Sequence, residues 1–335
     1  MNVHKDLGQL PIFKNAVVTI GTFDGVHTGH QQIIRQLKDE AEKIDGEPVI
    51  ITFHPHPRKI IGTTSKEIKL INTLEEKTEL LAAKGINHLV IVPFTIAFSE
   101  LSAEEYVRDF LISKFHPHTI IIGYDHRFGK ERKGDYHLLE DCCNVYNYIL
   151  KEIPVHVLNA VSVSSTRIRE AITNSEIESA NRLLGYDFFF EGTVIEGNKL
   201  GRTIGYPTAN LKIEDEEKIV PGDGVYVVGL SMVNSQWSKE AAANMKNLNS
   251  PFAIHRSLKG MMNIGDRPTV GSTKKTIEVN IFDFDEDIYG KALRVYVKKY
   301  LRGEQKFSGL DALKDQLVKD KMQTIAYFAG ERYKG

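Results

Sequence analysis

The chain has 335 residues, about twice the length of a common domain, which predicts two domains that each bury their own core. Its 43 basic and 44 acidic residues leave a formal charge of −1, so no overall field favours nucleic acid or an anionic membrane, and phosphate must be bound locally. No apolar run approaches the roughly 18 residues of a membrane span, no apolar signal core is present, and the only two cysteines are adjacent, so we expect a cytoplasmic protein with reduced thiols.

The first 185 residues alternate short apolar segments with segments of helical periodicity. The apolar segments are apolar on both faces, which is typical of parallel strands covered on both sides by helices. They comprise residues 16–20, 49–53, 88–94, 119–123 and 154–158. Residues 30–44 and 101–115 have apolar side chains at helical spacing. We therefore expect an α/β domain with a parallel sheet over residues 1–185.

After residue 185, strand-like segments broken by Gly, Pro, Asn and Asp replace most of the helical pattern. They comprise residues 188–197, 208–213, 224–233, 259–265, 276–284 and 292–301. This pattern predicts a small antiparallel barrel over residues 186–335. The amphipathic segment 308–328 predicts a C-terminal helix that packs against the barrel, and the polar segment 231–259 indicates a long hairpin excursion.

The segment GTFDGVHTGH, residues 21–30, lies between the first predicted strand and the first predicted helix. Open sheets bind ligands at the carboxyl ends of their strands, and glycines beside a helix N-terminus suit a phosphate. His27 and His30 are three residues apart and can donate hydrogen bonds and positive charge to a pentacoordinate phosphorus. On these residues alone, a glycine-rich turn with incidental histidines is the alternative, while zinc would need a third ligand that the segment lacks.

The segment SSTRIR, residues 164–169, suits phosphate binding. Ser164, Ser165 and Thr166 are good helix N-caps, and Arg167 and Arg169 follow in the first turn. An ordinary capped surface helix would have the same sequence.

The glycine-rich segment 191–211 contains Pro-Thr-Ala-Asn at residues 207–210. Glycine-rich turns can surround phosphates with backbone N–H groups. Thr208 and Asn210 are two residues apart in an extended segment, so their oxygens project to one side, as shared ligation of Mg²⁺ requires. Without the glycines, this tetrapeptide would indicate only the start of a strand.

These segments together carry a family resemblance. HTGH, residues 27–30, resembles the HxGH signature of nucleotidyltransferases, and the longer segment 21–30 resembles that of the bacterial bifunctional riboflavin kinase/FMN adenylyltransferases, or FAD synthetases. The resemblance covers nearly the whole chain and continues through residues 52–58, 122–135, 163–170, 207–210, 263–269, 276–284 and 300–307. It implies a Rossmann-like nucleotidyltransferase domain over residues 1–185 and a flavokinase barrel over residues 186–335.

The resemblance also implies roles for single residues. The catalytic residues would be His27, His30 and Glu278, with Glu278 as the general base of the kinase. ATP would be bound by Gly21, Phe23, Asp24, Gly29, Ser164, Ser165, Thr166, Arg167, Arg169, Gly201, Arg202 and Gly205. Flavin would be bound by His54, Pro55, Asp125, Phe128 and Arg302, and Mg²⁺ by Thr208 and Asn210.

Some positions depart from the family pattern or allow another interpretation. Asp125 replaces an asparagine found in some members, Asn280 replaces a frequent histidine, and Tyr300 stands where many members have a basic residue. His54 and His56 lie beside prolines, so they fit either the flavin side of the site or a rigid loop.

The resemblance implies two reactions. ATP phosphorylates riboflavin to FMN with release of ADP, and a second ATP adenylylates FMN to FAD with release of pyrophosphate. The expected partners are therefore these small molecules, without nucleic acid or membrane. A cytidylyltransferase or pantetheine-phosphate adenylyltransferase would share HTGH, but neither explains the second domain. An aminoacyl-tRNA synthetase would need a KMSKS-like segment, which the sequence lacks. A flavin-binding sensor without turnover is the alternative outside enzymology.

Overall fold

The computed structural model describes the chain except residues 63–67, 124, 154–162, 198–199, 234–257, 270–271 and 332–335. Two compact units are present: Met1–Ser165 forms the first, and the second begins at Thr166. The predicted strand 154–158 and most of the predicted excursion 231–259 lie outside the described residues.

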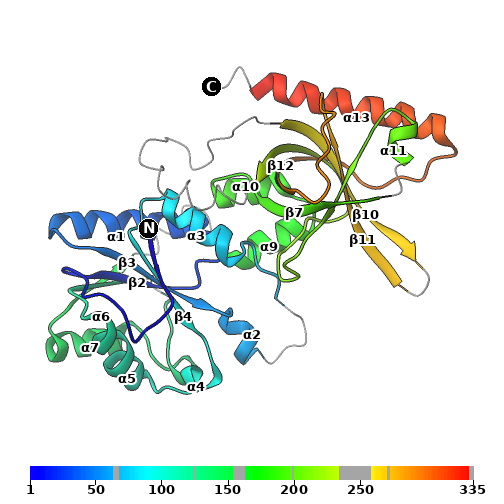
Figure 1. Cartoon of the computed structure of the whole chain (residues 1–335). Helices are drawn as coiled ribbons and strands as arrows, with labels where there is room; N and C mark the ends of the chain where they lie inside the picture. Colours follow the sequence, from blue (N-terminus) through cyan, green and yellow to red (C-terminus); the bar gives the residue numbers. More distant parts are fainter. Residues whose placement is uncertain are drawn as a thin grey trace. The chain divides into compact units, whose positions relative to one another are not determined.

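The first unit is built on a six-stranded sheet with the strand order β1-β4-β3-β2-β5-β6, and all of its strand pairs are parallel (Figure 1). The strands are β1 (Asn2–His4), β2 (Val17–Ile20), β3 (Pro48–His54), β4 (His88–Pro93), β5 (Thr119–Gly123) and β6 (Ile149–Ile153). Four of them coincide with predicted apolar segments, so the predicted parallel sheet is confirmed. The edge strands β1 and β6 were not predicted, because they are short and mostly not buried on both faces.

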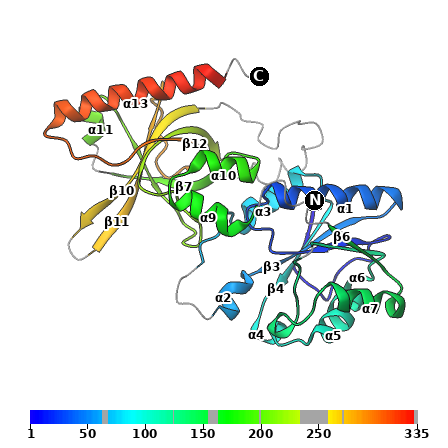
Figure 2. The ribbon, with the colours of Figure 1, turned by 180° about the vertical axis from the view of Figure 1, so that it is seen from behind.

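Helices cover both faces of this sheet (Figures 1 and 2). On one side lie α1 (Thr28–Lys43) and α3 (Leu74–Ala83), and on the other lie α5 (Ala103–Glu105), η1 (Tyr106–Ile112), α6 (Ser113–Phe115) and α7 (Tyr136–Tyr146). The short helices are α2 (Pro57–Ile61), α4 (Ile96–Ser99) and η2 (Lys130–Arg132). The predicted helix over 101–115 is present, but η1 in its middle is π-helical.

The strand order places the carboxyl end of β2 at a topological switch point. The chain passes from β2 to β3 and β4 on one side, and then returns to β5 on the other side of β2. In open α/β sheets, ligands bind in the crevice at such a reversal. The segment GTFDGVHTGH follows β2 directly, so the fold brings it to this position.

The second unit contains a closed barrel with the strand order β10-β11-β8-β7-β12-β9, in which all pairs are antiparallel. The strands are β7 (Phe189–Ile195), β8 (Ala209–Lys212), β9 (Gly224–Val233), β10 (Leu258–Thr269), β11 (Ser272–Ile281) and β12 (Ala292–Arg302). The C-terminal helix α13 (Leu310–Glu331) packs on β10 and buries Asp320, Thr324 and Phe328. The predicted barrel with a C-terminal helix is confirmed (Figure 1).

Further helices of this unit are α9 (Ser165–Thr173), which begins at the last residue of the first unit, α10 (Ile177–Leu184) and α11 (Leu200–Thr203). The Asn181 amide of α10 donates to the carbonyl oxygen of Val297 at 2.9 Å and accepts from the Phe188 N–H at 2.8 Å. The Tyr226 hydroxyl donates to Ser175 Oγ at 2.8 Å. These hydrogen bonds fix the helices before β7 against the barrel.

Candidate functional site

The loop after β2 has an unusual backbone. Phe23, Gly25 and Val26 have φ values of 48°, 88° and 35°, and non-glycine residues rarely adopt such values without compensation. The Phe23 side chain is buried, and its ring centroid lies 4.9 Å from that of His30. A Cβ at Gly21 would lie 3.2 Å from the Phe23 ring, so the glycine accommodates this packing. The strained loop thereby holds the Phe23 ring against the His30 ring.

His27 and His30 form a stacked pair at the N-terminus of α1. His27 is the N-cap, and its Nδ1 accepts a hydrogen bond from the backbone N–H of His30 at 3.3 Å. The two ring centroids are 3.6 Å apart with an interplanar angle of 14°. A Cβ at Gly29 would lie 3.2 Å from the His27 ring, which explains the glycine between the histidines. The HTGH spacing therefore builds two adjacent imidazoles at a helix end whose dipole favours anions.

The environment of His30 keeps its imidazole neutral. Burial lowers its pKa well below the usual value, and His27 and Lys77 lower it further by repulsion. Among the described residues, the buried Nδ1 of His30 has no hydrogen-bond partner. At pH 7 the ring therefore presents a neutral imidazole rather than a cation, with one nitrogen not used by the protein.

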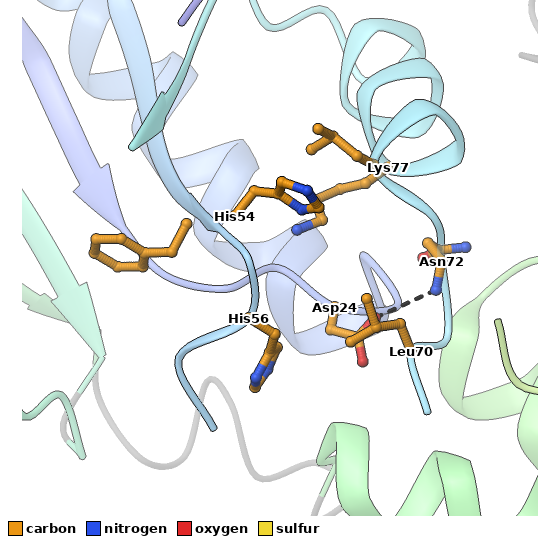
Figure 3. Close-up of a pocket in the computed structure, with 8 residues that line it drawn as sticks. Asp24, His54, His56, Leu70, Asn72 and Lys77 are labelled. Atoms are coloured by element: carbon orange, nitrogen blue, oxygen red, sulfur yellow. Dashed lines mark hydrogen bonds between the residues drawn. The ribbon is translucent and has the colours of Figure 1, made fainter. Parts of the chain in front are cut away.

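A small pocket lies next to the loop after β2 (Figure 3), and its lining includes Lys77, whose charge acts on His30. Asp24 projects into it from the loop after β2, and its carboxylate accepts the backbone N–H groups of Ile71 at 3.0 Å and Asn72 at 3.3 Å. The lining residues are Asp24, Phe53, His54, His56, Leu70, Asn72, Leu74 and Lys77. The pocket thus combines the ends of β2 and β3 with the segment that leads into α3.

Lys77 is a site residue that the sequence did not predict. Its ammonium donates to the carbonyl oxygen of Thr22 at 2.8 Å and lies 3.5 Å from Thr52 Oγ1. In the sequence it follows Glu75 and Glu76 in a charged helical segment, a pattern typical of a solvated helix face. Only the tertiary structure shows that its side chain is buried.

The two histidines beside prolines differ in their surroundings. His56 is buried and caps α2, with its Nδ1 accepting the backbone N–H of Arg58 at 3.2 Å. His54 is exposed at the end of β3 and precedes a cis peptide bond to Pro55. Both histidines line the pocket, so His56 caps α2 and also lies at the site.

The SSTRIR segment starts α9. The Ser165 hydroxyl donates to the carbonyl oxygen of Asp24 at 2.9 Å, within the first unit, and Ser164 is exposed immediately before the helix. The other predicted residues of this segment lie on α9 in the second unit: Thr166, Arg167 and Arg169.

The two predicted flavin residues after β5 differ in exposure. Asp125 is exposed. Phe128 is buried, and its ring stacks on that of Tyr106 at 5.0 Å. A Cβ at Gly134 would lie 2.4 Å from the Phe128 ring, so this glycine leaves the space that the ring fills. Phe128 therefore contributes to the hydrophobic core of the first unit.

The second cluster lies on the barrel. Glu278 of β11 is in register with Asn210 of β8, and the Thr208 hydroxyl donates to Glu278 Oε2 at 3.3 Å. Ile277 and Val279 are buried, so strand alternation directs Glu278 to the opposite face of the sheet. Thr208, Asn210 and Glu278 thus bring a hydroxyl, an amide and a carboxylate together.

Glycines provide the space around this cluster. A Cβ at Gly197 would lie 2.1 Å from Asn210 Nδ2, and a Cβ at Gly201 would lie 2.2 Å from the carbonyl oxygen of Tyr206. Each position therefore allows a close approach that any other residue would obstruct.

The turn before Thr208 is fixed from two directions. Gly205 has a φ of 83°, and its N–H donates to the carbonyl oxygen of Arg202 at 3.3 Å. Asn280 Nδ2 donates to the carbonyl oxygen of Pro207 at 2.7 Å. At this position, where the family often has histidine, the asparagine supports the turn. The Arg202 side chain is exposed on α11.

Arg302 has a partner that the sequence did not indicate. Its guanidinium donates to both carboxylate oxygens of Asp320 on α13, with Nη2 2.7 Å from Oδ2 and Nε 3.1 Å from Oδ1. Asp320 is 1% exposed and also accepts from Gln316 Nε2 at 2.9 Å. Arg302 thereby joins the end of β12 to the C-terminal helix.

Tyr300 stands where many members of the family have a basic residue. Its ring packs edge-on against Tyr226, with 5.4 Å between the ring centroids.

We expect Asp320→Ala to destabilise the barrel by about 3–5 kcal/mol, because it leaves the guanidinium of Arg302 partly buried without its counter-ion. Asp320→Asn, which keeps the shape and one acceptor oxygen, is the matched control and should lose less stability. Urea unfolding followed by circular dichroism measures both changes. An Asp320→Ala variant as stable as the wild type would show that the pair does not hold α13.

Within the described residues, no helix is long and apolar enough to cross a membrane. Nor does this part of the chain contain a group of three or more His, Cys, Asp or Glu side chains suited to a metal ion. The cluster of Thr208, Asn210 and Glu278 instead supplies few oxygen ligands, which suits Mg²⁺, because this ion usually keeps waters and completes its shell with substrate phosphates.

The chain is similar to proteins of established families. Residues 10–167 match the family described as FAD synthetase, and residues 184–328 match the family described as riboflavin kinase. The bifunctional riboflavin kinase/FMN adenylyltransferase of Listeria monocytogenes is 36% identical over 94% of this chain and 93% of its own length. That of Escherichia coli is 32% identical over 96% of both chains.

A crystal structure named as a macrolide-efflux protein from Streptococcus pneumoniae has 31% sequence identity to this chain and a TM-score of 0.81. The alignment covers 96% of this chain and 98% of the other, so the two proteins share their fold over both units. The chain thus has an FAD synthetase domain followed by a riboflavin kinase domain, and it belongs to the family of bifunctional riboflavin kinase/FMN adenylyltransferases.

Proposed function

We propose that this protein converts riboflavin to FAD in two ATP-dependent steps, with the kinase step on the barrel and the adenylyl transfer at the β2–α1 loop. The observation that carries the proposal is the presence of two separate clusters in one chain. One is the stacked pair of His27 and His30 at the switch point, and the other is Glu278 with Thr208 and Asn210 on the barrel. The domain boundary that we propose, near residue 185, separates the two activities.

In the kinase step, Glu278 accepts the proton of the riboflavin ribityl 5′-hydroxyl as this oxygen attacks the γ-phosphorus of ATP. FMN and ADP are the products. Thr208 and Asn210 would hold Mg²⁺, which, when bound, neutralises charge on the ATP phosphates. The glycines at positions 201 and 205, with Arg202, would contact the ATP, and Arg302, held by Asp320, would contact the flavin.

In the adenylyl transfer, a phosphate oxygen of FMN attacks the α-phosphorus of a second ATP, and pyrophosphate leaves. The attacking phosphate is already ionised near pH 7, so the step needs positioning and charge stabilisation more than a base. His27 and His30 would stabilise the pentacoordinate phosphorus by hydrogen bonds from the N-terminus of α1. ATP would also contact the loop residues Gly21, Phe23, Asp24 and Gly29 and the helix-start residues Ser164, Ser165, Thr166, Arg167 and Arg169. Flavin would contact His54, Pro55, Asp125 and Phe128. We place both reactions in the cytoplasm.

Incubation with riboflavin, ATP and Mg²⁺, followed by chromatography of the flavins, tests the proposal. We expect FMN to form first and FAD to follow, because FMN is the substrate of the second step. Incubation with FMN and ATP should give FAD directly. Unchanged riboflavin and unchanged FMN would favour a flavin-binding sensor over an enzyme.

Removal of divalent metal tests the metal cluster. With excess EDTA we expect FMN formation to stop, because Thr208 and Asn210 are neutral and cannot offset the charge of the ATP phosphates without the metal ion. FMN formation should return when Mg²⁺ is restored. Thr208→Ala should raise the Mg²⁺ concentration needed for half-maximal kinase rate. A kinase rate that EDTA does not alter would remove the metal from this step.

A further inference from the structure

Lys77 has a buried ammonium group at the edge of the pocket beside His30. It is 7% exposed, and α3 directs it toward the carboxyl ends of β2 and β3. Its hydrogen bonds go to two neutral groups, the Thr22 carbonyl at 2.8 Å and the Thr52 hydroxyl at 3.5 Å. In Figure 3 the amine is on the side of the pocket where His54 lies. The group thus occupies the place where parallel sheets bind ligands.

The charge of Lys77 is poorly balanced by the protein. Of the carboxylates in the described residues, Asp24 is the one whose charge acts on Lys77, and the two hydrogen bonds of the ammonium go to neutral oxygens instead. Asp24 already accepts two backbone N–H groups through one of its oxygens. An ammonium removed from water without a close counter-ion costs several kcal/mol. For the fold alone, an apolar side chain of the same length would be the more stable choice.

His30 does not supply a cation. His30 is kept neutral by burial, by His27 and by Lys77 itself. An uncharged imidazole can donate one hydrogen bond but carries no net charge toward a phosphate. Between His30 and Lys77, the lysine is therefore the side chain that carries a positive charge at pH 7.

We propose that Lys77 binds a phosphate oxygen during adenylyl transfer and supplies the positive charge that the neutral His30 lacks. The inference rests on the proposed location of this reaction in the first unit. The phosphate belongs either to ATP or to FMN, because both carry the same anionic chemistry. A buried ammonium is stronger in this role than an exposed one, since the low local dielectric increases its attraction for the anion.

Lys77→Met tests the proposal in the full-length protein, because methionine keeps an unbranched stem and removes the charge. We expect kcat/KM for FMN adenylylation to fall about 10²–10³-fold, as for loss of one preorganised electrostatic donor. The riboflavin kinase rate of the same chain should be unchanged, and the melting temperature should be equal or higher. A near wild-type adenylylation rate would overturn the proposal. So would a lower melting temperature with both activities reduced, because this is the result of a purely structural lysine.

Binding measurements identify the phosphate and need no turnover. We expect either FMN or inorganic pyrophosphate to bind at least tenfold more weakly to Lys77→Met than to the wild type. Weaker FMN binding assigns Lys77 to the acceptor phosphate, and weaker pyrophosphate binding assigns it to ATP. Unchanged binding of both would overturn the proposal. Absence of FAD in the wild-type reaction would instead contradict the proposed function.

The pH profile gives a readout that a structural role would not change. Burial lowers the pKa of Lys77 to about 8, with Asp24 opposing the shift. The charged form is thus lost as the pH rises through 8, and kcat/KM for FMN adenylylation should fall about tenfold for each pH unit above it. Among the described residues, Asp24 from the loop after β2 and His54 and His56 from the end of β3 line the pocket with Lys77, and His30 of α1 interacts with it electrostatically. Carboxyl and imidazole groups titrate below this range in general.

Lys77→Arg completes the test, since a guanidinium stays charged throughout this range. If the variant retains activity, its alkaline limb should disappear. The same alkaline limb in Lys77→Arg and in the wild type would overturn the assignment of the limb to Lys77.

Discussion

Replacement of Glu278 by glutamine is expected to abolish FMN formation from riboflavin while adenylylation of added FMN continues at the wild-type rate. The glutamine keeps the volume and can still accept the hydrogen bond that Thr208 donates at 3.3 Å, but it cannot take up a proton. A positioned general base contributes about 10²–10⁴-fold to a rate, so a loss of this size is expected in kcat. Initial rates of FMN and FAD formation, measured by chromatography, check both halves of the prediction.

Two uncharged residues flank Glu278 in the barrel. In the sheet the residue lies between Asn210 on β8 and Asn263 on β10, and both are neutral. Glu278→Ala, which also removes the hydrogen-bond acceptor, should lose the same activity. A glutamine variant that phosphorylates riboflavin near the wild-type rate would exclude Glu278 as the base.

His30→Ala is expected to lower the rate of FMN adenylylation about 10²–10³-fold, the usual loss when one electrostatic donor is removed from a transition state. His30 is the member of the stacked pair whose buried Nδ1 lacks a hydrogen-bond partner among the described residues, so its removal does not strand a protein group. The riboflavin kinase rate should be unchanged. Steady-state assays with FMN and with riboflavin as substrates measure the two rates on one preparation.

His116→Ala is the matched control, because His116 is an exposed histidine of the same unit, at the end of α6. It should keep both activities. The His30 assignment would be contradicted if His30→Ala lost both activities equally, since a general loss of folding would then explain the result. Thermal unfolding of the two variants separates a folding defect from a catalytic one.

The sequence identified the elements whose signal is local. The runs that form β2 to β5 are rich in β-branched residues and buried on both faces, so they were recognisable without a partner. The loop after β2 was recognisable because glycines and histidines follow such a run. By contrast, β1 and β6 lie at the edges of the sheet and have no continuous apolar pattern, and only pairing with β4 and β5 makes them strands.

The environment of single side chains was not predictable. Lys77 lies in a helical segment with neighbouring glutamates, and its burial results from packing of α3 against the ends of β2 and β3. Arg302 was expected to contact flavin, but its pairing with Asp320 depends on how α13 crosses the barrel. The neutral state of His30 depends on burial and on repulsion by His27 and by Lys77 of α3. Such properties arise from tertiary contacts between residues far apart in the chain.

Complementation between two single variants tests the separation of the two chemistries most directly. Supplied with riboflavin, ATP and Mg²⁺, His30→Ala should accumulate FMN and Glu278→Gln should leave riboflavin unchanged. An equimolar mixture of the two should produce FAD, because FMN released by one variant is adenylylated by the other. The assignment of one reaction to each cluster would be contradicted if riboflavin stayed unphosphorylated in the mixture and each variant had lost both activities.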